Sequence, residues 1–269
     1  MKKDLVIIKL GGSVITKKES NKPVFKKSIA KHLCREIYQA KKQKKFDLIL
    51  VHGAGSFAHP IAKKYRLNEG YLGPESAKGF ALTKFGVLKL NLLVWQELER
   101  ANLAACIVES SAVIRANSGR IKEFDTKFIE MLLAQDIIPL LSGDVVIDEK
   151  MGFSIISGDQ ITAFLARKFL ANKVVFVSDV DGIFDKNPKV YPNARLVPEI
   201  NNKNYRNIIE KMKVKNKKDV TGEMKGKILS IKRGLQGVKV IITNGQRKGN
   251  MLKSLVNNRS DNIGTVINF

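Results

Sequence analysis

Short apolar runs alternate along the chain with longer stretches in which apolar residues recur every third or fourth position. The apolar runs end at polar residues or glycine, which is typical of strands buried on both faces of a parallel sheet. We expect such strands at residues 4–10, 47–52, 104–108, 137–141, 174–177, 238–243 and 264–268.

The longer stretches predict helices. Between residues 25 and 44, Ile29, Leu33 and Ile37 fall on one face of a helix. Asp125 is a suitable N-cap for a helix that follows it. The remaining helices are expected at residues 76–101, 126–135, 157–171, 202–212 and 222–235.

Two hairpins interrupt this alternation. Asn117-Ser118-Gly119-Arg120 is typical of a tight turn, and the runs at 145–147 and 153–156 flank a second turn. The pattern indicates an α/β protein, with a largely parallel central sheet sandwiched by helices and short β-hairpin insertions. We expect one domain over residues 1–269, with an internal boundary near residue 172.

Two glycine-rich turns follow neighbouring strands of the predicted sheet. The first is Lys9-Leu10-Gly11-Gly12-Ser13, and the second is His52-Gly53-Ala54-Gly55-Ser56-Phe57-Ala58-His59-Pro60. Glycine lets a backbone approach a ligand closely and turn its N–H groups toward phosphate oxygens. Two such turns side by side could hold two phosphate groups, as phosphoryl transfer between two phosphorylated molecules requires.

The second turn also fits a different interpretation. Gly53-Ala54-Gly55-Ser56-Phe57-Ala58 matches the dinucleotide-binding pattern, so an NAD-dependent dehydrogenase is an alternative. That pattern usually occupies the first strand-to-helix turn, which here is the Lys9 turn. The acidic residue expected about 20 positions later would be Glu69 or Glu75, and both lie in loop-like sequence.

Acidic residues and a histidine accompany these turns. Asp179-Val180-Asp181-Gly182 follows a strand; it could form a structural Asx-turn, or its carboxylates could orient a catalytic lysine or a hydrated Mg²⁺. His59 lies inside the second turn and could donate to a phosphate oxygen. His52 ends an apolar strand and is typical of a core residue, and we give His32 no role.

A third glycine-containing segment, Gly222-Glu223-Met224-Lys225-Gly226-Lys227-Ile228, superficially resembles a Walker A loop. Its first glycine is one position out of place, and Ile228 stands where the Ser or Thr that binds Mg²⁺ would be. A phosphate-binding turn ahead of a helix remains consistent with the sequence.

Charge adds a competing hypothesis. The chain has 48 Lys and Arg against 25 Asp and Glu, a formal net charge of +23. Such an excess suits nucleic acid, an anionic membrane or phosphorylated small molecules. The basic residues are spread along the whole chain without aromatic residues between them for base stacking. We therefore favour a hydrated lysine-rich surface and expect no nucleic-acid partner.

The remaining composition bears on location. Cys34 and Cys106 are isolated in apolar sequence and are interpreted as buried thiols in a reducing compartment. No stretch approaches the ~18 consecutive apolar residues of a membrane span. We expect a soluble cytoplasmic protein without a membrane partner.

Taken together, the motifs resemble the amino acid kinase superfamily and, within it, the isopentenyl phosphate kinases. The resemblance covers nearly the whole chain. It depends on the two glycine turns, on Ile156-Ser157-Gly158-Asp159, on Asp179-Val180-Asp181-Gly182 and on Asp219-Val220-Thr221-Gly222. The histidine before proline in the second turn is its most specific element. Fosfomycin kinases share much of the pattern, so another phosphate or phosphonate acceptor is the alternative.

The resemblance implies an amino acid kinase-like αβα sandwich that phosphorylates isopentenyl phosphate with ATP and Mg²⁺, a step of isoprenoid biosynthesis. It implies an acceptor-binding lobe over 1–171, a nucleotide-binding lobe over 172–269 and a homodimer. Lys9, Lys18 and His59 would be catalytic, with Lys17 the adjacent candidate for Lys18. The ATP site would comprise Lys9, Gly11, Gly12, Ser13, Gly55, Asp179, Asp181, Gly182, Glu223 and Lys227, and the acceptor site Ala54, Gly55, His59 and Gly158.

Two residues depart from the family pattern. Glu223 and Ala58 each occupy a position that is often glycine in this family. A glutamate side chain facing phosphate would repel it, and alanine narrows the conformations open to the loop. For the apolar tail of the acceptor, the candidate walls are Phe57, Tyr71, Phe80 and Thr83, although ordinary core packing explains the aromatic residues equally well.

Overall fold

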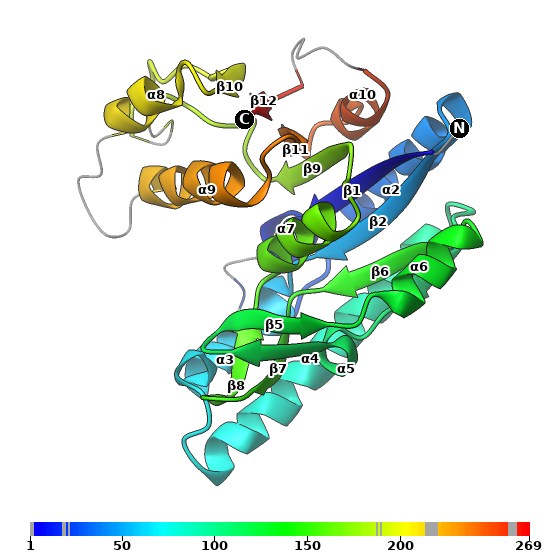
Figure 1. Ribbon diagram of the computed structural model, residues 1–269, viewed down its shortest axis with the longest axis vertical. Coiled ribbons are helices and arrows are strands. Elements are labelled where there is room, and N and C mark those ends of the chain that lie inside the picture. Colours follow the sequence, from blue (N-terminus) through cyan, green and yellow to red (C-terminus); the bar gives the residue numbers. More distant parts are fainter. Residues whose placement is uncertain are drawn as a thin grey trace.

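A central sheet of eight strands runs through the molecule (Figure 1). The structure is a computed structural model that describes residues 3–17, 20, 22–186, 188, 190–212, 220–257 and 263–269. In spatial order, the sheet contains β10 (Glu199–Asn201), β12 (Thr265–Asn268), β11 (Lys239–Asn244), β9 (Lys173–Ser178), β1 (Asp4–Leu10), β2 (Phe46–His52), β6 (Ile138–Ser142) and β3 (Ala105–Ile107). Six neighbouring strands, from β11 to β3, are parallel, and β12 is antiparallel to β11.

The register of the three central strands brings their carboxyl ends together. Leu10, the last residue of β1, lies opposite His52 on β2 and Val177 on β9. The Lys9 turn, the His52 turn and the loop that begins at Asp179 therefore leave the sheet at the same edge. Ligands of open α/β sheets bind at this edge.

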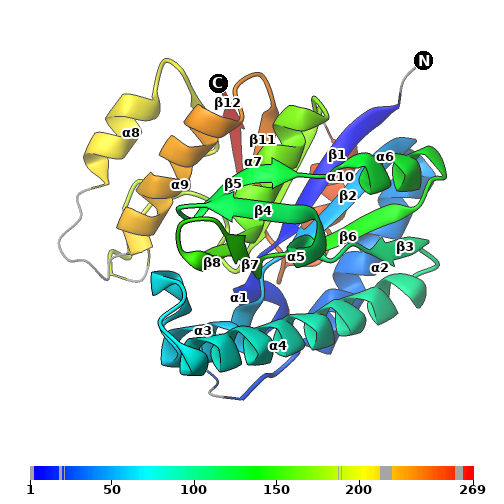
Figure 2. The same cartoon turned by 60° about the horizontal axis from the view of Figure 1, so that its bottom comes forward.

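Helices cover both faces of the sheet (Figures 1 and 2). Alternate residues of one strand enter different cores: Ile7 of β1 packs in one cluster and Ile8 in the other, and both are fully buried. One face carries α2 (Lys27–Gln43), α4 (Pro74–Glu99) and α10 (Asn250–Val256); the other carries α6 (Lys127–Ala134), α7 (Gly158–Lys168), α8 (Tyr205–Lys211) and α9 (Val220–Gly234). Burial on both faces explains the almost continuous apolar runs of the strands.

A second sheet forms one end of the molecule, beside α3 and the start of α4 (Figure 1). Its four strands are ordered β5 (Arg120–Phe124), β4 (Ile114–Asn117), β7 (Asp144–Asp148) and β8 (Gly152–Ile156). The shorter elements are α1 (Gly12–Ile15), α3 (His59–Lys64), α5 (Ser110–Val113) and the 3₁₀ turns Gly55–Phe57 and Leu67–Glu69.

The predicted αβα sandwich and both hairpins are confirmed. Helix α6 begins after Thr126 instead of Asp125, although the Asp125 carboxylate still accepts a hydrogen bond from Lys127 N at 3.0 Å. The pattern missed the short elements α1, α3, α5, α10 and β10. Those helices have four to seven residues each, too few to show a helical period.

The two cysteines differ in their burial. Burial raises the pKa of the Cys34 thiol to about 12, whereas Cys106 is partly exposed, contrary to prediction.

The edge strand β3 is covered by Trp95 of α4, whose indole Nε1 donates to Ala105 O at 2.9 Å. Within the described part of the chain, no helix is long and apolar enough to cross a membrane.

Asp148, at the end of β7, ties the two hairpin turns together. Its Oδ1 accepts hydrogen bonds from the backbone N–H groups of Ser118, Lys150 and Met151, each at 3.0 Å, and its Oδ2 from Gly119 N at 2.8 Å. Burial alone would raise the pKa of this carboxyl, but the N–H donors hold it at about 2.

We expect Asp148→Asn to lower the free energy of unfolding at pH 7 by about 1–3 kcal/mol, because charge-assisted hydrogen bonds are lost. A depressed pKa stabilises the fold above the unfolded pKa of about 3.9 and loses that effect as the pH falls through the folded value. In urea unfolding, the difference from wild type should therefore shrink from pH 5 toward pH 2. The control Glu123→Gln, on an exposed strand, should cost no more than about 1 kcal/mol; equal stability of Asp148→Asn and wild type at pH 7 would contradict the assignment.

Candidate active site

A pocket of about 550 Å³ opens at the carboxyl ends of β1, β2, β6 and β9. Its volume is within the range of about 300–1,000 Å³ that is common for small-molecule sites. Its lining comes from segments 9–13 (except Leu10), 53–60 (except Phe57), 143–145, 155–159 and 177–180, with Ala62, Thr83, Val87 and Lys227.

The two glycine turns interlock, backbone against backbone, at the base of this pocket. Gly53 N donates to Leu10 O at 2.9 Å. A Cβ atom on Gly12 would lie 2.7 Å from Gly55 N, and one on Gly53 would lie 2.9 Å from Gly12 N. Any side chain at either position would push the turns apart. Both predicted phosphate cradles are therefore parts of one rigid unit.

Thr16 fastens this unit, and sequence reasoning missed it. Its hydroxyl donates to Gly12 O at 2.7 Å and accepts from Ser56 N at 3.0 Å, so one buried side chain bridges both turns. Gly55 adopts a φ of +50° directly beside it, where a Cβ would lie 2.0 Å from the Thr16 hydroxyl oxygen. A threonine seven residues after Lys9 carries no signal in the sequence that distinguishes it from any other threonine.

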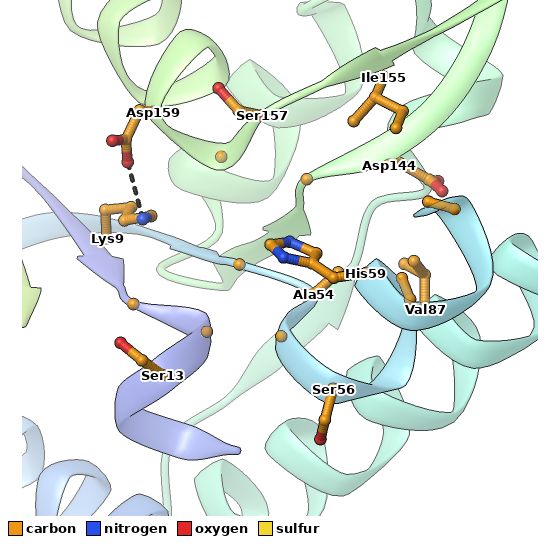
Figure 3. Close-up of a pocket in the computed structure, with 18 of the residues that line it drawn as sticks. Lys9, Ser13, Ala54, Ser56, His59, Val87, Asp144, Ile155, Ser157 and Asp159 are labelled. Carbon is orange, nitrogen blue, oxygen red and sulfur yellow. Dashed lines mark ion pairs between the residues drawn. The ribbon is translucent and has the colours of Figure 1, made fainter. Parts of the chain in front are cut away.

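On one side of the pocket, the Asp159 carboxylate lies between two ammonium groups. Figure 3 shows its ion pair with Lys9. Lys9 Nζ lies 2.7 Å from Asp159 Oδ1, and Lys227 Nζ lies 3.9 Å from Asp159 Oδ2. Burial alone would raise the pKa of the Asp159 carboxyl, but Lys9 and Lys227 hold the pKa below its usual range. Two positive charges against one negative charge give this group of three residues a net positive charge, which suits phosphate.

Helix α7 places Asp159 at its first turn. Ser157 is the N-cap: its hydroxyl accepts from Gln160 N, and the Gln160 side chain accepts from Ser157 N, which together make a capping box. Gly158 lies close to both β1 and β2, because a Cβ there would be 3.1 Å from His52 O and 3.4 Å from Lys9 Cε. The predicted Gly158 thus lines the same pocket as Lys9.

The other side of the pocket carries His59 and an apolar wall. Figure 3 shows the imidazole extending from the first residue of α3 into the pocket, with Lys9 on one side and Val87 and Asp144 on the other. Thr83 lines the pocket as predicted, whereas Phe57, Tyr71 and Phe80 do not. Sequence reasoning missed the remaining apolar walls, Val87, Val145, Ile155 and Ile156.

The Asp179 motif divides between two positions. Asp179 lines the pocket and its Oδ1 accepts from the Ser13 hydroxyl at 3.1 Å. Asp181 and Gly182 are not part of the lining. The Asp181 carboxylate instead accepts from Asn244 Nδ2 at 2.8 Å and from Arg247 at 2.6 Å. A nucleotide contact for Asp181 and Gly182 stays a prediction.

Of the two candidate lysines, only Lys17 lies within the described residues. Lys18 lies outside the described residues, and the adjacent Lys17 is exposed and does not line the pocket. Glu223 belongs to α9, but its side chain is not among those described. Ala58 has φ −129°, which any residue can adopt, so its departure from glycine costs the loop nothing. Ile228 is fully buried in the core, which agrees with rejection of a Walker A loop.

The other two histidines have structural surroundings. His52 is fully buried; burial lowers the pKa of its imidazole to about 4, so it is neutral at pH 7. This agrees with its interpretation as a core residue. His32 Nε2 lies 2.8 Å from Gly245 O, away from the pocket lining.

Comparison with known proteins agrees with this geometry. The model of the Amino acid kinase family matches residues 4–244, and the chain therefore belongs to that family. It is 36% identical to an isopentenyl phosphate kinase from Methanothermobacter thermautotrophicus, over 94% of this chain and 95% of the relative. A second isopentenyl phosphate kinase, from Methanocaldococcus jannaschii, is 32% identical over 98% of this chain and 99% of the relative.

A solved structure of isopentenyl phosphate kinase agrees with the fold. It superposes with a TM-score of 0.79 at 33% identity, covering 98% of this chain and 99% of that chain. The similarity thus includes both sheets and extends over nearly the full length.

The interlocked turns generate a prediction. In Gly12→Ala the new methyl group would collide with Gly55 N, so the two turns would have to separate. We expect the affinity for ATP to fall at least about tenfold, because small displacements of positioned groups are costly. Isothermal titration with a non-hydrolysable ATP analogue measures this. The matched control is Gly226→Ala in α9, where a Cβ meets nothing within 4 Å. Unchanged affinity in Gly12→Ala would contradict the interlock.

Proposed function

We propose that this chain transfers the terminal phosphoryl group of ATP to isopentenyl phosphate, giving ADP and isopentenyl diphosphate. The observation that carries the proposal is the meeting of two glycine cradles, Lys9 and His59 in one pocket. Relatives named isopentenyl phosphate kinase, aligned over nearly the whole chain, support this acceptor. Neither the dehydrogenase nor the nucleic-acid alternative gains support from them.

The reaction depends on alignment and charge neutralisation. The attacking oxygen belongs to a phosphate that is already ionised, so no strong general base is needed. In the proposed arrangement, backbone N–H groups of the first turn hold the ATP phosphates, and those of Ala54 and Gly55 lie where donor and acceptor meet. Lys9 and Lys227, held by Asp159, neutralise charge on the transferring group. His59 donates to the acceptor phosphate and fixes its direction of attack.

Membership of a kinase family implies ATP use, and we propose that Mg²⁺ accompanies the nucleotide. Mg²⁺ commonly binds through one or two carboxylates together with substrate phosphates. Asp179 offers one carboxylate at the pocket, beside the Ser13 hydroxyl. When bound, Mg²⁺ would neutralise phosphate charge.

The acceptor tail fits the apolar side of the pocket. Val87 of α4 faces the region that Val145 of β7 and Ile155 of β8 also line. Figure 3 shows Val87 and Ile155 beyond His59, as seen from Lys9, so an alkenyl tail can extend away from the transferring phosphoryl group. This polarity, with cations at one end and aliphatic residues at the other, supports a phosphate with a short hydrocarbon chain.

The lobe division remains part of the proposal. Residues 1–171 supply His59 and the apolar walls, and residues 172–269 supply Asp179 and Lys227. We therefore propose an acceptor-binding lobe over 1–171 and a nucleotide-binding lobe over 172–269. The first glycine turn, although it precedes the boundary, lies between the two and would contact ATP.

We also propose that the enzyme is a homodimer joined through α4. This helix exposes large apolar side chains at every third or fourth position, in a row formed by Leu82, Phe85, Leu88, Leu92 and Trp95. A contiguous apolar row of this kind is unusual on the surface of a monomer. A second copy of the same helix would cover it symmetrically.

The proposed acceptor is tested with a panel. Wild-type enzyme, ATP and Mg²⁺ should phosphorylate isopentenyl phosphate with a kcat/KM at least about tenfold above that for fosfomycin, because a site built for one tail rejects another. In His59→Ala we expect kcat/KM for isopentenyl phosphate to fall about 100-fold or more, as when one stabilising donor is removed. The KM for ATP should change little. Coupled release of ADP measures all of these.

The control for this prediction is His32→Ala, which removes a histidine that contacts Gly245 O outside the pocket lining. Its kinetic constants should match wild type. Equal activity of His59→Ala and His32→Ala would remove His59 from the site, and a preference for fosfomycin would replace the proposed acceptor.

The dimer has its own test. Multi-angle light scattering should give twice the chain mass of 30.0 kDa for wild type. Leu92→Glu, which buries a charge in the proposed interface, should give the monomer mass. Leu170→Glu alters a residue that is 79% exposed outside the row and should leave the dimer intact. A monomeric wild type would overturn the proposed dimer.

A further inference from the structure

Lys84 is a residue of α4 that neither the sequence analysis nor the proposed mechanism uses. We propose that it is a positioning residue that fixes the width of the acceptor pocket and thereby the length of tail that the enzyme accepts. This inference rests on the proposed function, because it concerns the same acceptor site.

Helix α4 and strand β7 both line the apolar end of the pocket. Helix α4 contributes Thr83 and Val87, and strand β7 contributes Asp144 and Val145. Lys84 is the chain neighbour of Thr83, and its Nζ lies 2.5 Å from Asp144 Oδ2. The ion pair therefore joins α4 to β7 at Asp144, which lines the pocket, and at Lys84, which is next to the lining residue Thr83.

A third element joins this pair. Lys84 Nζ also forms an ion pair with Glu109, which follows β3 and precedes α5. Each carboxylate has a second donor: Asn91 Nδ2 donates to Glu109 Oε1 at 3.2 Å, and Val145 N donates to Asp144 Oδ1 at 2.9 Å. One ammonium group thus connects three segments that are far apart in the sequence.

Burial strengthens the ion pairs of Lys84 with Glu109 and Asp144, so that they can fix the distance between α4 and β7. The side chain of Asp144 is fully buried, and those of Lys84 and Glu109 are 19% and 28% exposed. Burial raises the pKa of the Asp144 carboxyl despite Lys84 beside it. Burial also opposes the charge on Lys84, but the two carboxylates raise its pKa above the usual value. Without the ammonium group, two carboxylates would face each other in a poorly hydrated space.

The opposite side of α4 cannot adjust the pocket. At Gly86 the helix packs directly on the second glycine turn, where a Cβ would lie 2.0 Å from Phe57 O. This contact fixes α4 against the second glycine turn. The separation between Val87 and Val145 then depends on the ion pairs of Lys84 on the other side.

The experiment compares two acceptors, isopentenyl phosphate and a ten-carbon alkenyl phosphate, in wild type, Lys84→Met and Lys84→Arg. We expect Lys84→Met to raise the KM for isopentenyl phosphate about tenfold and to shift the kcat/KM ratio at least about tenfold toward the longer acceptor, because a wider pocket discriminates tail size poorly. The KM for ATP should stay within about twofold, since Asp144 of this cluster lies on the other side of the pocket from Lys9 (Figure 3). Lys84→Arg, which keeps the positive charge, should recover most of the wild-type ratio.

Two further proteins keep the test decisive. The matched control is Lys78→Met, which removes an exposed lysine from the same helix and should behave as wild type. If Lys84→Met does not fold, the triple variant Lys84→Met/Glu109→Gln/Asp144→Asn takes its place. It removes the ion pairs of Lys84 together with the repulsion between the two carboxylates. It should show the same shift in the kcat/KM ratio of the two acceptors.

Each outcome separates the two proposals. A wild-type enzyme that does not phosphorylate isopentenyl phosphate overturns the proposed function. A wild type that does so, together with a folded Lys84 variant that keeps the wild-type acceptor ratio, overturns the role of Lys84 alone. Equal rises in the KM values for ATP and acceptor would also overturn it, because they indicate a general structural defect.

Discussion

The close packing of Gly12, Gly53 and Gly55 is the contact on which the rest of the site depends. Where a Cβ would lie within 3 Å of the facing backbone, only glycine allows two turns from neighbouring strands to touch. Parallel pairing of β1 and β2 brings the turns to one edge, and Thr16 bridges them with two hydrogen bonds. In the proposed reaction, the positions of the donor and acceptor phosphates are therefore set by backbone atoms, which move less than side chains do.

Charge is arranged around this rigid base. Asp159 holds an ammonium group from β1 and another from α9, segments more than two hundred residues apart. A carboxylate between two lysines keeps their side chains extended toward the pocket and leaves an excess positive charge for phosphate. Because the phosphoryl group carries its charge throughout transfer, groups that are already in position contribute most to the rate.

Much of the fold could be predicted from sequence because burial on both faces gives uninterrupted apolar strands and long amphipathic helices. The glycine turns and His59 could be identified because local sequence alone specifies them. Asp159 belongs to the motif Ile156-Ser157-Gly158-Asp159, but its pairing with Lys9 and Lys227 depends on tertiary distance. The tail walls could not be predicted for the same reason: Val87, Val145 and Ile155 resemble any other core residue, whereas Phe57 and Phe80 looked distinctive and pack elsewhere.

The hydrogen bond from Trp95 to Ala105 affects one edge of the central sheet. Ala104 O accepts from Ile138 on β6, so Ala105 O points toward the unpaired border of the sheet. A strand from another molecule that approached there would have to displace the indole before it could pair. A three-residue border strand with its carbonyl already engaged is a poor template for aggregation. The chain's single tryptophan thus opposes the addition of a further strand at this edge of the sheet.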